Sequence, residues 1–282
     1  MSYYDTRFNS TILIIRQDGT IYDLGKLGFR VKSFDPPSPQ YTHTFQQFGS
    51  HGVELVDTKT QQTTIPLVLN IIAYDTQDFE LKRMQLHYIF NSDEEFYVMT
   101  TRMPYLRWKV VAEPWTANQL NNFWSARDVS INLTCPTGYA ESTATTLQPF
   151  TYESNAWGVG EFLPLKTKPR YSFTESTFKL FNAGTIPLKA EEHPVTITFK
   201  GNIPRKLSII NHTTNQTITF EKKLDNHATL IWYGLVPVLQ GVQNYGMGIS
   251  NHGYLDFAVG WNDIEIVGAN NFQITFDTRF YY

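Results

Sequence analysis

Hydrophobic and polar residues alternate with a period of two along much of the chain. The clearest examples are residues 128–134, 195–200 and 272–277, where nearly every second residue is apolar. This period places the apolar side chains on one face of a half-buried strand. Because turn residues separate the apolar runs, further strands are expected at 11–16, 28–34, 64–74, 96–100, 106–112 and 228–233. The pattern therefore predicts a mainly antiparallel β protein.

One segment has a helical pattern instead. Between Asp78 and Phe90 the apolar residues cover a broad face of a helix. Asp75 or Thr76 can cap the N-terminus, and Asp78 and Glu80 place negative charge where the helix dipole favours it. The Asn-Ser-Asp sequence that follows ends the pattern. We therefore expect one helix of about three turns, packed on a sheet.

A long polar stretch interrupts the predicted strands. Residues 35–52, DPPSPQYTHTFQQFGSHG, are rich in Pro, Gln, Ser and His. An unstructured stretch of this length is uncommon inside a compact domain, and such loops often carry function. Two interpretations stay open at this point. The stretch is either a contact arm that orders against a neighbour or a mobile surface loop.

The chain divides near residues 136–149. Pro136-Thr137-Gly138 ends a strand, small polar residues follow, and Pro149 precedes a new aromatic-rich segment. The 282 residues suffice for one large or two medium domains. We therefore expect a β domain with one packed helix at 1–140, a linker at 141–149, and an all-β domain at 150–282.

Composition narrows the classes of protein. Lys and Arg total 23 against 26 Asp and Glu, a net charge of -3 that gives no global footprint for nucleic acid or an anionic membrane. Charged residues are 17% and aromatic residues 15%, the reverse of a disordered chain. The single cysteine, Cys135, excludes an internal disulfide framework and a cysteine-based zinc site.

Targeting signals are also missing from the sequence. The first residues lack the apolar stretch of a secretory signal, and no apolar run approaches the roughly 20 residues of a membrane-spanning helix. We therefore expect a soluble protein that is made in a cytoplasm and does not bind a membrane.

The sequence offers no recognisable constellation for catalysis. Its seven histidines are scattered, and none has the spacing of a metal site. Cys135 has no motif that would lower its pKa, and neither a nucleophile elbow nor a phosphate-binding loop occurs. Glu94-Glu95 and Glu191-Glu192 are adjacent in sequence, so their side chains point to different faces. We expect no enzymatic activity, no cofactor and no metal.

Tryptophan raises the question of sugar binding, because aromatic faces stack on pyranose rings. Tryptophan also fills protein cores and subunit interfaces. The sequence does not cluster its tryptophans in one segment, which favours the second explanation. The six are Trp108, Trp115, Trp124, Trp157, Trp232 and Trp261.

The order of several short motifs resembles a known family. In the first half these are LGFRV (27–31), IPLVL (65–69) and PYLRW (104–108). In the second half they are FKLFNAG (178–184), LSIINHTT (207–214), GWNDIEI (260–266) and ITFDTRFYY (274–282). Their order and spacing resemble the distal tail protein family of bacteriophages with long non-contractile tails, over nearly the whole chain.

The resemblance implies an assembly function at the virion tail tip. The first domain would form a hexameric ring, alone or as two stacked rings, that joins the tail tube protein to the baseplate. The second would be a galectin-like antiparallel β-sandwich that carries receptor-binding or other baseplate proteins. A tail-associated hub protein would be a further partner, and DNA would only pass through the central channel.

We expect the ring contacts to come from the polar stretch and from the strand edges at 65–74. A closed ring requires one patch on a subunit to meet a different patch on the next. The candidate contact residues are Asp35, Pro37, Tyr41, Phe45, Phe48, Leu67 and Leu69.

Two other classes stay open. One is a carbohydrate-binding module that recognises host cell-wall glycans and is a monomer. The other is a divergent glycoside hydrolase, which needs two inward carboxylates in a cleft. The oligomeric state tests the first, and the arrangement of acidic side chains tests the second.

Overall fold

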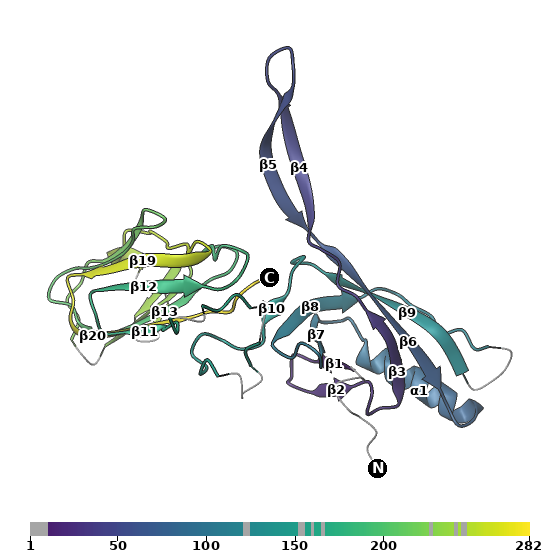
Figure 1. The fold of residues 1–282 in the computed structure, drawn as a ribbon. Coiled ribbons are helices and arrows are strands. Elements are labelled where there is room, and N and C mark those ends of the chain that lie inside the picture. The colour runs from purple at the N-terminus through teal and green to yellow at the C-terminus, as the bar shows by residue number, and fades with distance from the viewer. Residues whose placement is uncertain are drawn as a thin grey trace. The chain divides into compact units, whose positions relative to one another are not determined.

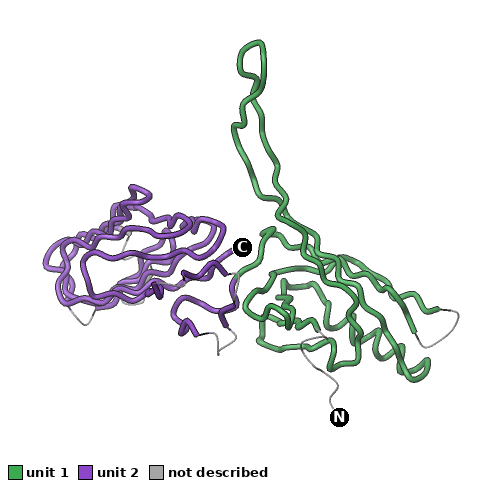
Figure 2. Tube along the Cα trace, in the orientation of Figure 1, with its two compact units in different colours: residues 1–141 green, residues 142–282 purple. Residues whose placement is uncertain are grey.

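The computed structural model describes residues 11–120, 125–151, 156–158, 161–164, 167–225, 228–239, 242–243 and 247–282. The chain divides into two compact units, residues 1–141 and 142–282 (Figure 2). Over the described ranges both units are built from antiparallel strands, and the one α-helix lies in unit 1, which confirms the predicted fold class. That the ranges 1–140 and 150–282 fold independently stays a prediction.

Unit 1 contains one large sheet, in which the strands follow the order β2-β1-β7-β8-β9-β6-β3 (Figure 1). The longest pairing joins β6 to β9, where Leu67 lies opposite Ile131 and Leu69 opposite Val129. The strands are β1 (Ile12–Ile15), β2 (Ile21–Asp23), β3 (Phe29–Phe34), β6 (Thr63–Ile72), β7 (Phe96–Thr100), β8 (Leu106–Ala112) and β9 (Ser125–Cys135). Their alternating apolar residues face one core, together with α1.

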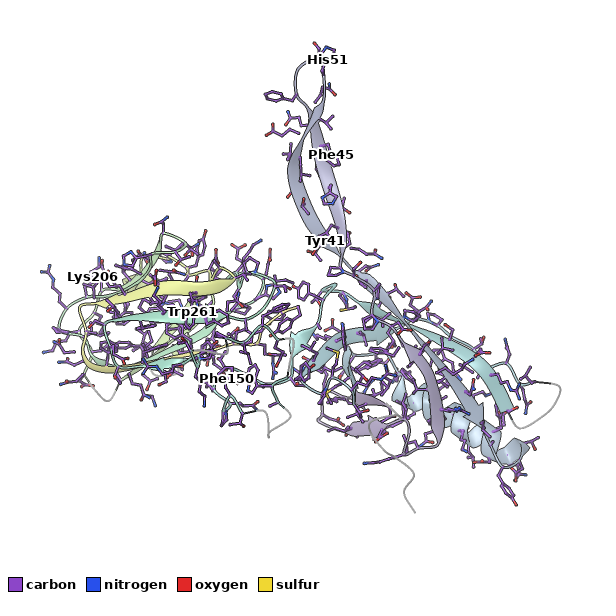
Figure 3. The ribbon with its side chains drawn as sticks, viewed as in Figure 1. Tyr41, Phe45, His51, Phe150, Lys206 and Trp261 are labelled. Carbon is purple, nitrogen blue, oxygen red and sulfur yellow. The ribbon has the colours of Figure 1, made fainter. Side chains whose placement is uncertain are left out.

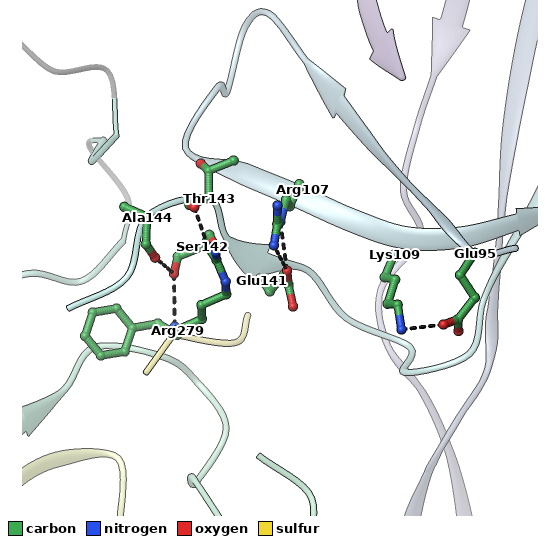
Figure 4. Close-up of polar contacts among 9 residues, drawn as sticks. Glu95, Arg107, Lys109, Glu141, Ser142, Thr143, Ala144 and Arg279 are labelled. Atoms are coloured by element: carbon green, nitrogen blue, oxygen red, sulfur yellow. Dashed lines mark hydrogen bonds and ion pairs between the residues drawn. The ribbon is translucent and has the colours of Figure 1, made fainter. Parts of the chain in front are cut away.

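Ion pairs cover the sheet of unit 1 near β8 (Figure 4). The Arg107 guanidinium donates from Nε to Glu141 Oε1 at 2.7 Å, and it lies 3.7 Å from the centre of the Tyr97 ring. Lys109 forms an ion pair with Glu95. The short strand β10 (Glu141–Ser142) follows β9 at the point in the sequence where unit 2 begins.

The predicted helix is confirmed as α1 (Thr76–Ile89). Asp75 is the N-cap residue, and its carboxylate accepts a hydrogen bond from the backbone N–H of Asp78 at 2.8 Å. The helix buries Phe79, Leu86 and Ile89 against the sheet. With 14 residues it makes roughly four turns, about one more than the pattern predicts.

Replacing Asp75 with alanine is expected to lower the free energy of unfolding of unit 1 by about 1 kcal/mol, because the N–H of Asp78 loses its acceptor. Chemical denaturation followed by circular dichroism measures this loss. Asp75→Asn, which keeps an acceptor at this position, is the control and should lose little. Equal losses in both variants would show that the side chain does not act as a cap.

The polar stretch at 35–52 is not a loop throughout. Its residues 40–47 form β4 (Gln40–Gln47), which pairs with β5 (Val53–Gln61) in a separate two-stranded sheet. The interpretation as a mobile loop is therefore wrong for this part. Period-two alternation is weak here because every residue of both strands is exposed. Tyr, Thr and Phe nevertheless favour an extended backbone.

Unit 2 is an antiparallel β-sandwich, as expected for the second half. One sheet has the order β11-β20-β13-β16-β17-β18 and the other β12-β19-β14-β15 (Figure 1). The first comprises β11 (Ser172–Phe173), β13 (Thr196–Asn202), β16 (Thr229–Tyr233), β17 (Val236–Leu239), β18 (Val242–Gln243) and β20 (Asn270–Asp277). The second comprises β12 (Thr177–Asn182), β14 (Leu207–Asn211), β15 (Gln216–Phe220) and β19 (Gly260–Val267). The 3-10 helix η2 (Met247–Ile249) lies between β18 and β19 in the chain.

Large side chains from both sheets fill the core of unit 2. Phe199 and Phe276 come from the first sheet, while Leu180 and Ile209 come from the second. Gly268 makes the turn between β19 and β20 with φ of 84°, and a Cβ atom there would lie 1.9 Å from the Lys206 carbonyl oxygen. A side chain at this position would therefore collide with the backbone just before β14 (Leu207–Asn211).

The first residues of unit 2 are held by its last ones. The backbone N–H of Ser142 donates to the Phe280 carbonyl at 2.8 Å, and that of Thr146 donates to the Thr278 carbonyl at 3.0 Å. The Arg279 guanidinium also donates to the carbonyl oxygens of Ser142 and Thr143 (Figure 4). Ser142 and Thr146 are buried although the sequence predicted a linker at 141–149.

Candidate assembly surfaces

The hairpin of β4 and β5 is an extended arm, here defined as residues 40–61. Figure 3 shows Tyr41, Phe45 and His51 along its length. Tyr41 is 54% exposed, Phe45 is 59% exposed and Phe48, in the turn, is 72% exposed. An isolated two-stranded hairpin is at best marginally stable in water. A partner that covers this apolar area would therefore stabilise the arm.

The two faces of the arm differ in chemistry. Residues that lie directly opposite each other in an antiparallel pair share a face. Phe45 lies opposite Leu55 and Gln47 opposite Val53, while Tyr41 and His43 lie opposite threonines. We call this the aromatic face, and it comprises Tyr41, His43, Phe45, Gln47, Val53, Leu55, Thr58 and Thr60. The other face carries Thr42, Thr44, Gln46, Glu54, Asp57 and Lys59.

The aromatic face is organised as a row of rings. The ring centres of Tyr41 and His43 are 6.4 Å apart, and those of His43 and Phe45 are 6.2 Å apart. His43 Nδ1 lies 3.0 Å from Thr58 Oγ1 across the hairpin, which fixes the middle ring. The row of rings forms a continuous strip. Among the described residues of unit 1, no other segment buries it.

The second exposed apolar surface lies on α1. Leu81, Met84 and Tyr88 are 66%, 65% and 69% exposed. Their spacing of three and then four residues puts them on one face of the helix, which we call the α1 stripe. The sequence predicts these residues as part of the packed face, and this is wrong because α1 buries a different set. A helix on the surface of a sheet has only one side to bury.

A hollow of about 590 Å³ lies beside the α1 stripe. Leu81 and Met84 supply its apolar side chains, and Tyr88 packs edge-on against Tyr22 at 6.3 Å. The remaining lining residues are polar: Thr76, Gln77, Glu80 and Gln119. The hollow is wide enough for an aromatic side chain from outside.

The structure separates the predicted contact residues into two groups. Asp35 and Pro37 are exposed ahead of the arm, and Tyr41, Phe45 and Phe48 lie on the arm. These five stay predictions. Leu67 and Leu69 are fully buried in the core of unit 1, because their face of β6 packs inward. We therefore remove these two leucines from the candidate surface.

Sequence reasoning did not single out the α1 stripe or the aliphatic part of the arm. The spacing of Leu81, Met84 and Tyr88 was visible, but the apolar residues of this segment exceed one helix face and the sequence does not say which are buried. Val53 and Leu55 lie just outside the polar stretch and gave no signal by themselves. Their pairing with β4 is what places them on the aromatic face.

Tryptophan does not form a sugar-binding cluster in the described residues. Trp157 and Trp232 fill the core of unit 2, which confirms the expected role for these two. Trp261 is 38% exposed on β19, where it contacts Phe181 of β12 with ring centres 4.8 Å apart (Figure 3). Trp108 and Trp115 pack against the core of unit 1. Trp124 lies outside the described residues.

Titratable side chains do not gather into a metal site within the described ranges: no group of three His, Cys, Asp or Glu residues lies close enough to hold an ion. Cys135 is fully buried as a free thiol at the end of β9. The structure also has no helix, over the same residues, that is long and apolar enough to cross a membrane.

One buried carboxyl in unit 2 has a shifted pKa. Burial raises the pKa of Glu161 from its ordinary 4.5 to about 7, although the backbone N–H of Gly158 donates to one carboxylate oxygen at 2.6 Å and opposes the shift. The other carboxylate oxygen is buried without a hydrogen-bond partner. The folded state therefore holds the Glu161 proton at pH values where the unfolded chain has lost it.

Glu161 makes the stability of unit 2 depend on pH. Because its folded pKa is the higher one, the free energy of unfolding should fall as pH rises from 4.5 to about 7 and then level off. Glu161→Gln, which resembles the protonated form, should be more stable than wild type at pH 8 by on the order of 3 kcal/mol. The two proteins should have equal stability at pH 4.

Thermal unfolding between pH 4 and pH 8 measures this difference. Glu191→Gln, at an exposed position, is the matched control and should follow the wild type at every pH. A constant difference between Glu161→Gln and wild type across the range would contradict the shift.

A family model matches part of unit 1, and the match does not extend into unit 2. Residues 17–135, which lie in unit 1, match the family model of the phage tail protein RIFT-related domain. None of the curated proteins matches the sequence.

The chain is similar in fold to a solved phage protein over nearly its whole length. The crystal structure of the SPP1 Dit (gp 19.1) protein, described as a paradigm of the hub adsorption apparatus in phages that infect Gram-positive bacteria, has 11% identity and a TM-score of 0.68. The match covers 95% of this chain and 99% of that chain.

Chains from the phage p2 baseplate in its activated conformation also match. The structure with Sr has 10% identity, a TM-score of 0.48, and coverage of 95% of this chain and 97% of that chain. The structure with Ca has 8% identity, a TM-score of 0.46, and coverage of 95% and 98%. At such low identities these likenesses concern the fold alone.

Proposed function

We propose that the chain has a structural role in the phage tail tip, because residues 17–135 match the family model of the phage tail protein RIFT-related domain and the chain has the fold of a solved Dit protein. Six copies form an adaptor ring that joins the tail tube protein to the baseplate. The ring leaves a central channel through which DNA passes during ejection.

The arm is the observation that carries this proposal. It exposes a continuous aromatic face at a cost in solubility, and exposed apolar patches of this kind mark interaction sites. Unit 1 also has a second and different apolar surface on α1. A cyclic ring needs two different patches per subunit, whereas a two-fold dimer needs only one self-complementary patch. The pair of surfaces therefore favours a ring.

The charge of the first half is compatible with a channel for DNA. Residues 1–140 contain 12 Lys and Arg against 14 Asp and Glu. Each contact between a cation and a phosphate adds affinity that would hold DNA in place. A channel wall without an excess of cations lets DNA slide.

Unit 2 serves as the platform for receptor-binding or other baseplate proteins, and a tail-associated hub protein is a further partner of the ring. Its sandwich keeps a closed core, so its contacts come from the sheet surfaces and turns. Exposed apolar side chains at these places support this role: Tyr233, Leu235, Tyr254, Val259, Trp261 and Val267.

A carbohydrate-binding module that recognises host cell-wall glycans is the second candidate. Trp261 and Phe181 favour it, because the exposed Trp261 of β19 pairs with the half-buried Phe181 of β12. Lys179 and Asp263 form an ion pair of 3.2 Å on the same two strands and supply polar groups. Such a module needs neither the arm nor a ring.

Native mass spectrometry of the purified chain over a range of concentrations tests the proposal. We expect a hexamer or two stacked hexamers, with a ring visible by negative-stain electron microscopy. A strict monomer at high concentration would contradict the ring. Binding of that monomer to a glycan array would then establish the carbohydrate-binding module.

A further inference from the structure

We propose that the arm of one copy docks on the α1 stripe of the next copy, with its aromatic face against Leu81, Met84 and Tyr88. The inference rests on the proposed ring and names the two surfaces that close it. The occupant of the α1 stripe is thus a second copy of this chain.

The two surfaces do not meet within one copy. The arm ends at Gln61, just before β6 begins at Thr63, whereas α1 begins at Thr76, after β6 has ended at Ile72. The ten residues of β6 span roughly 33 Å, so α1 begins at the end of this strand that is far from the arm, and the arm extends away from the sheet (Figure 1). Contact between them is therefore intermolecular, and it is head to tail.

The areas of the two surfaces agree with a stable interface. The exposed fractions correspond to roughly 500 Å² of apolar area on the arm and roughly 400 Å² on the α1 stripe, since large side chains offer about 150–250 Å² each. Because about 57% of a typical interface is apolar, a contact with this apolar area buries roughly 1,600 Å² in total. That is the size of a standard specific interface.

The Asp, Glu, Lys and Arg side chains of α1 are paired, and so are two of the three on the arm; the third, Glu54, lies on the polar face. Lys82 lies 3.3 Å from Asp78, and Arg83 pairs with Glu80 along α1. On the arm, Lys59 lies 3.6 Å from Asp57 on the polar face. Docking of the aromatic face on the α1 stripe thus brings apolar side chains together without burying an unpaired charge.

The shapes are also complementary. The aromatic face is a narrow row of rings, and the α1 stripe has a hollow lined by Leu81 and Met84 at one side. A ring from the arm, Phe45 or Phe48, fills this hollow when the row lies along the helix. The α1 stripe supplies flexible side chains, because methionine adapts its shape to an aromatic partner.

Cysteine cross-linking tests the contact. Gln47→Cys lies on the aromatic face and Gln85→Cys lies within the α1 stripe, so both variants keep every apolar residue of the two surfaces. The native Cys135 is fully buried and does not react under native conditions. With a short bismaleimide, the double variant should give covalent species up to the hexamer on a denaturing gel.

The single variants serve as controls and should stay monomeric on the same gel, because each has only one reactive side of the contact. Rings of the double variant that contain no covalent species would overturn the arm–α1 contact and leave the proposed ring intact. A wild-type protein that never assembles would overturn both.

A double-mutant cycle provides a second measurement. Phe45→Ser and Met84→Ser should each raise the concentration needed for half-maximal assembly at least tenfold. If the two side chains share the contact, the double variant should do little worse than the more severe single variant. Effects that simply multiply would overturn the contact, since independent surfaces behave in that way.

Discussion

Removal of the arm is expected to abolish ring assembly without unfolding either unit. Every residue of β4 and β5 is exposed, so the arm adds nothing to the core of unit 1. The roughly 500 Å² of apolar area on the arm corresponds to about 12 kcal/mol of gross transfer free energy per contact, of which association retains a part. Loss of this term should raise the assembly concentration by more than 1,000-fold.

The variant joins Gln40 to Gln61 through an Asn-Gly turn, which suits a two-residue hairpin connection. Sedimentation velocity measures assembly, and thermal unfolding measures stability. Thr44→Ser with Gln46→Ser, on the polar face, is the control and should assemble like wild type. Intact rings of the armless protein would show that the arm does not form the contact.

Replacement of the buried Leu67 with alanine is expected to have the opposite effect: it lowers the stability of unit 1 and leaves ring assembly intact. Leu67 is 0% exposed in the core of unit 1, so the variant should lose about 2–5 kcal/mol of unfolding free energy. Assembly should persist wherever unit 1 stays folded, because this side chain does not reach the surface. Phe45→Ala, on the arm, should change stability by less than about 0.5 kcal/mol and weaken assembly.

Denaturant unfolding followed by tryptophan fluorescence detects the unfolding of both units, because Trp108 and Trp115 pack against the core of unit 1 while Trp157 and Trp232 lie in the core of unit 2. The transition of unit 2 should be the same in Leu67→Ala as in wild type. If Leu67→Ala unfolds like wild type in unit 1 but no longer assembles, Leu67 is part of the ring contact after all.

The sequence predicted those helices and strands that bury one face in a core and expose the other. Val129, Ile131 and Leu133 alternate with polar residues because β9 has one face in the core, and the helix carries a capping residue at Asp75. The arm has no buried face, so its strands lack the alternation by which strands are recognised. The period-two rule detects a core rather than an extended backbone.

The candidate contacts were harder to predict, for a related reason. Leu67 and Leu69 are apolar strand residues near a sheet edge in sequence, but β9 pairs with β6 and their face turns inward. Which of two apolar helix faces is buried likewise depends on where α1 meets the sheet. Neither fact is encoded locally, since both depend on residues distant in sequence.

The hydrogen bonds that join the first residues of unit 2 to its last ones, here called the clasp, have a mechanical consequence. Residues 142–146 run antiparallel to residues 276–280, and the second segment continues directly from β20 inside the sandwich. A force that pulls Ser142 toward the N-terminus is balanced where the second segment joins β20, near Phe276. The two segments are therefore pulled from opposite ends of their pairing. The hydrogen bonds of the clasp, with those of Arg279, are then loaded in parallel as a shear and do not open one by one. Unit 2 can therefore bear tension along the chain without its strands peeling from the sheet.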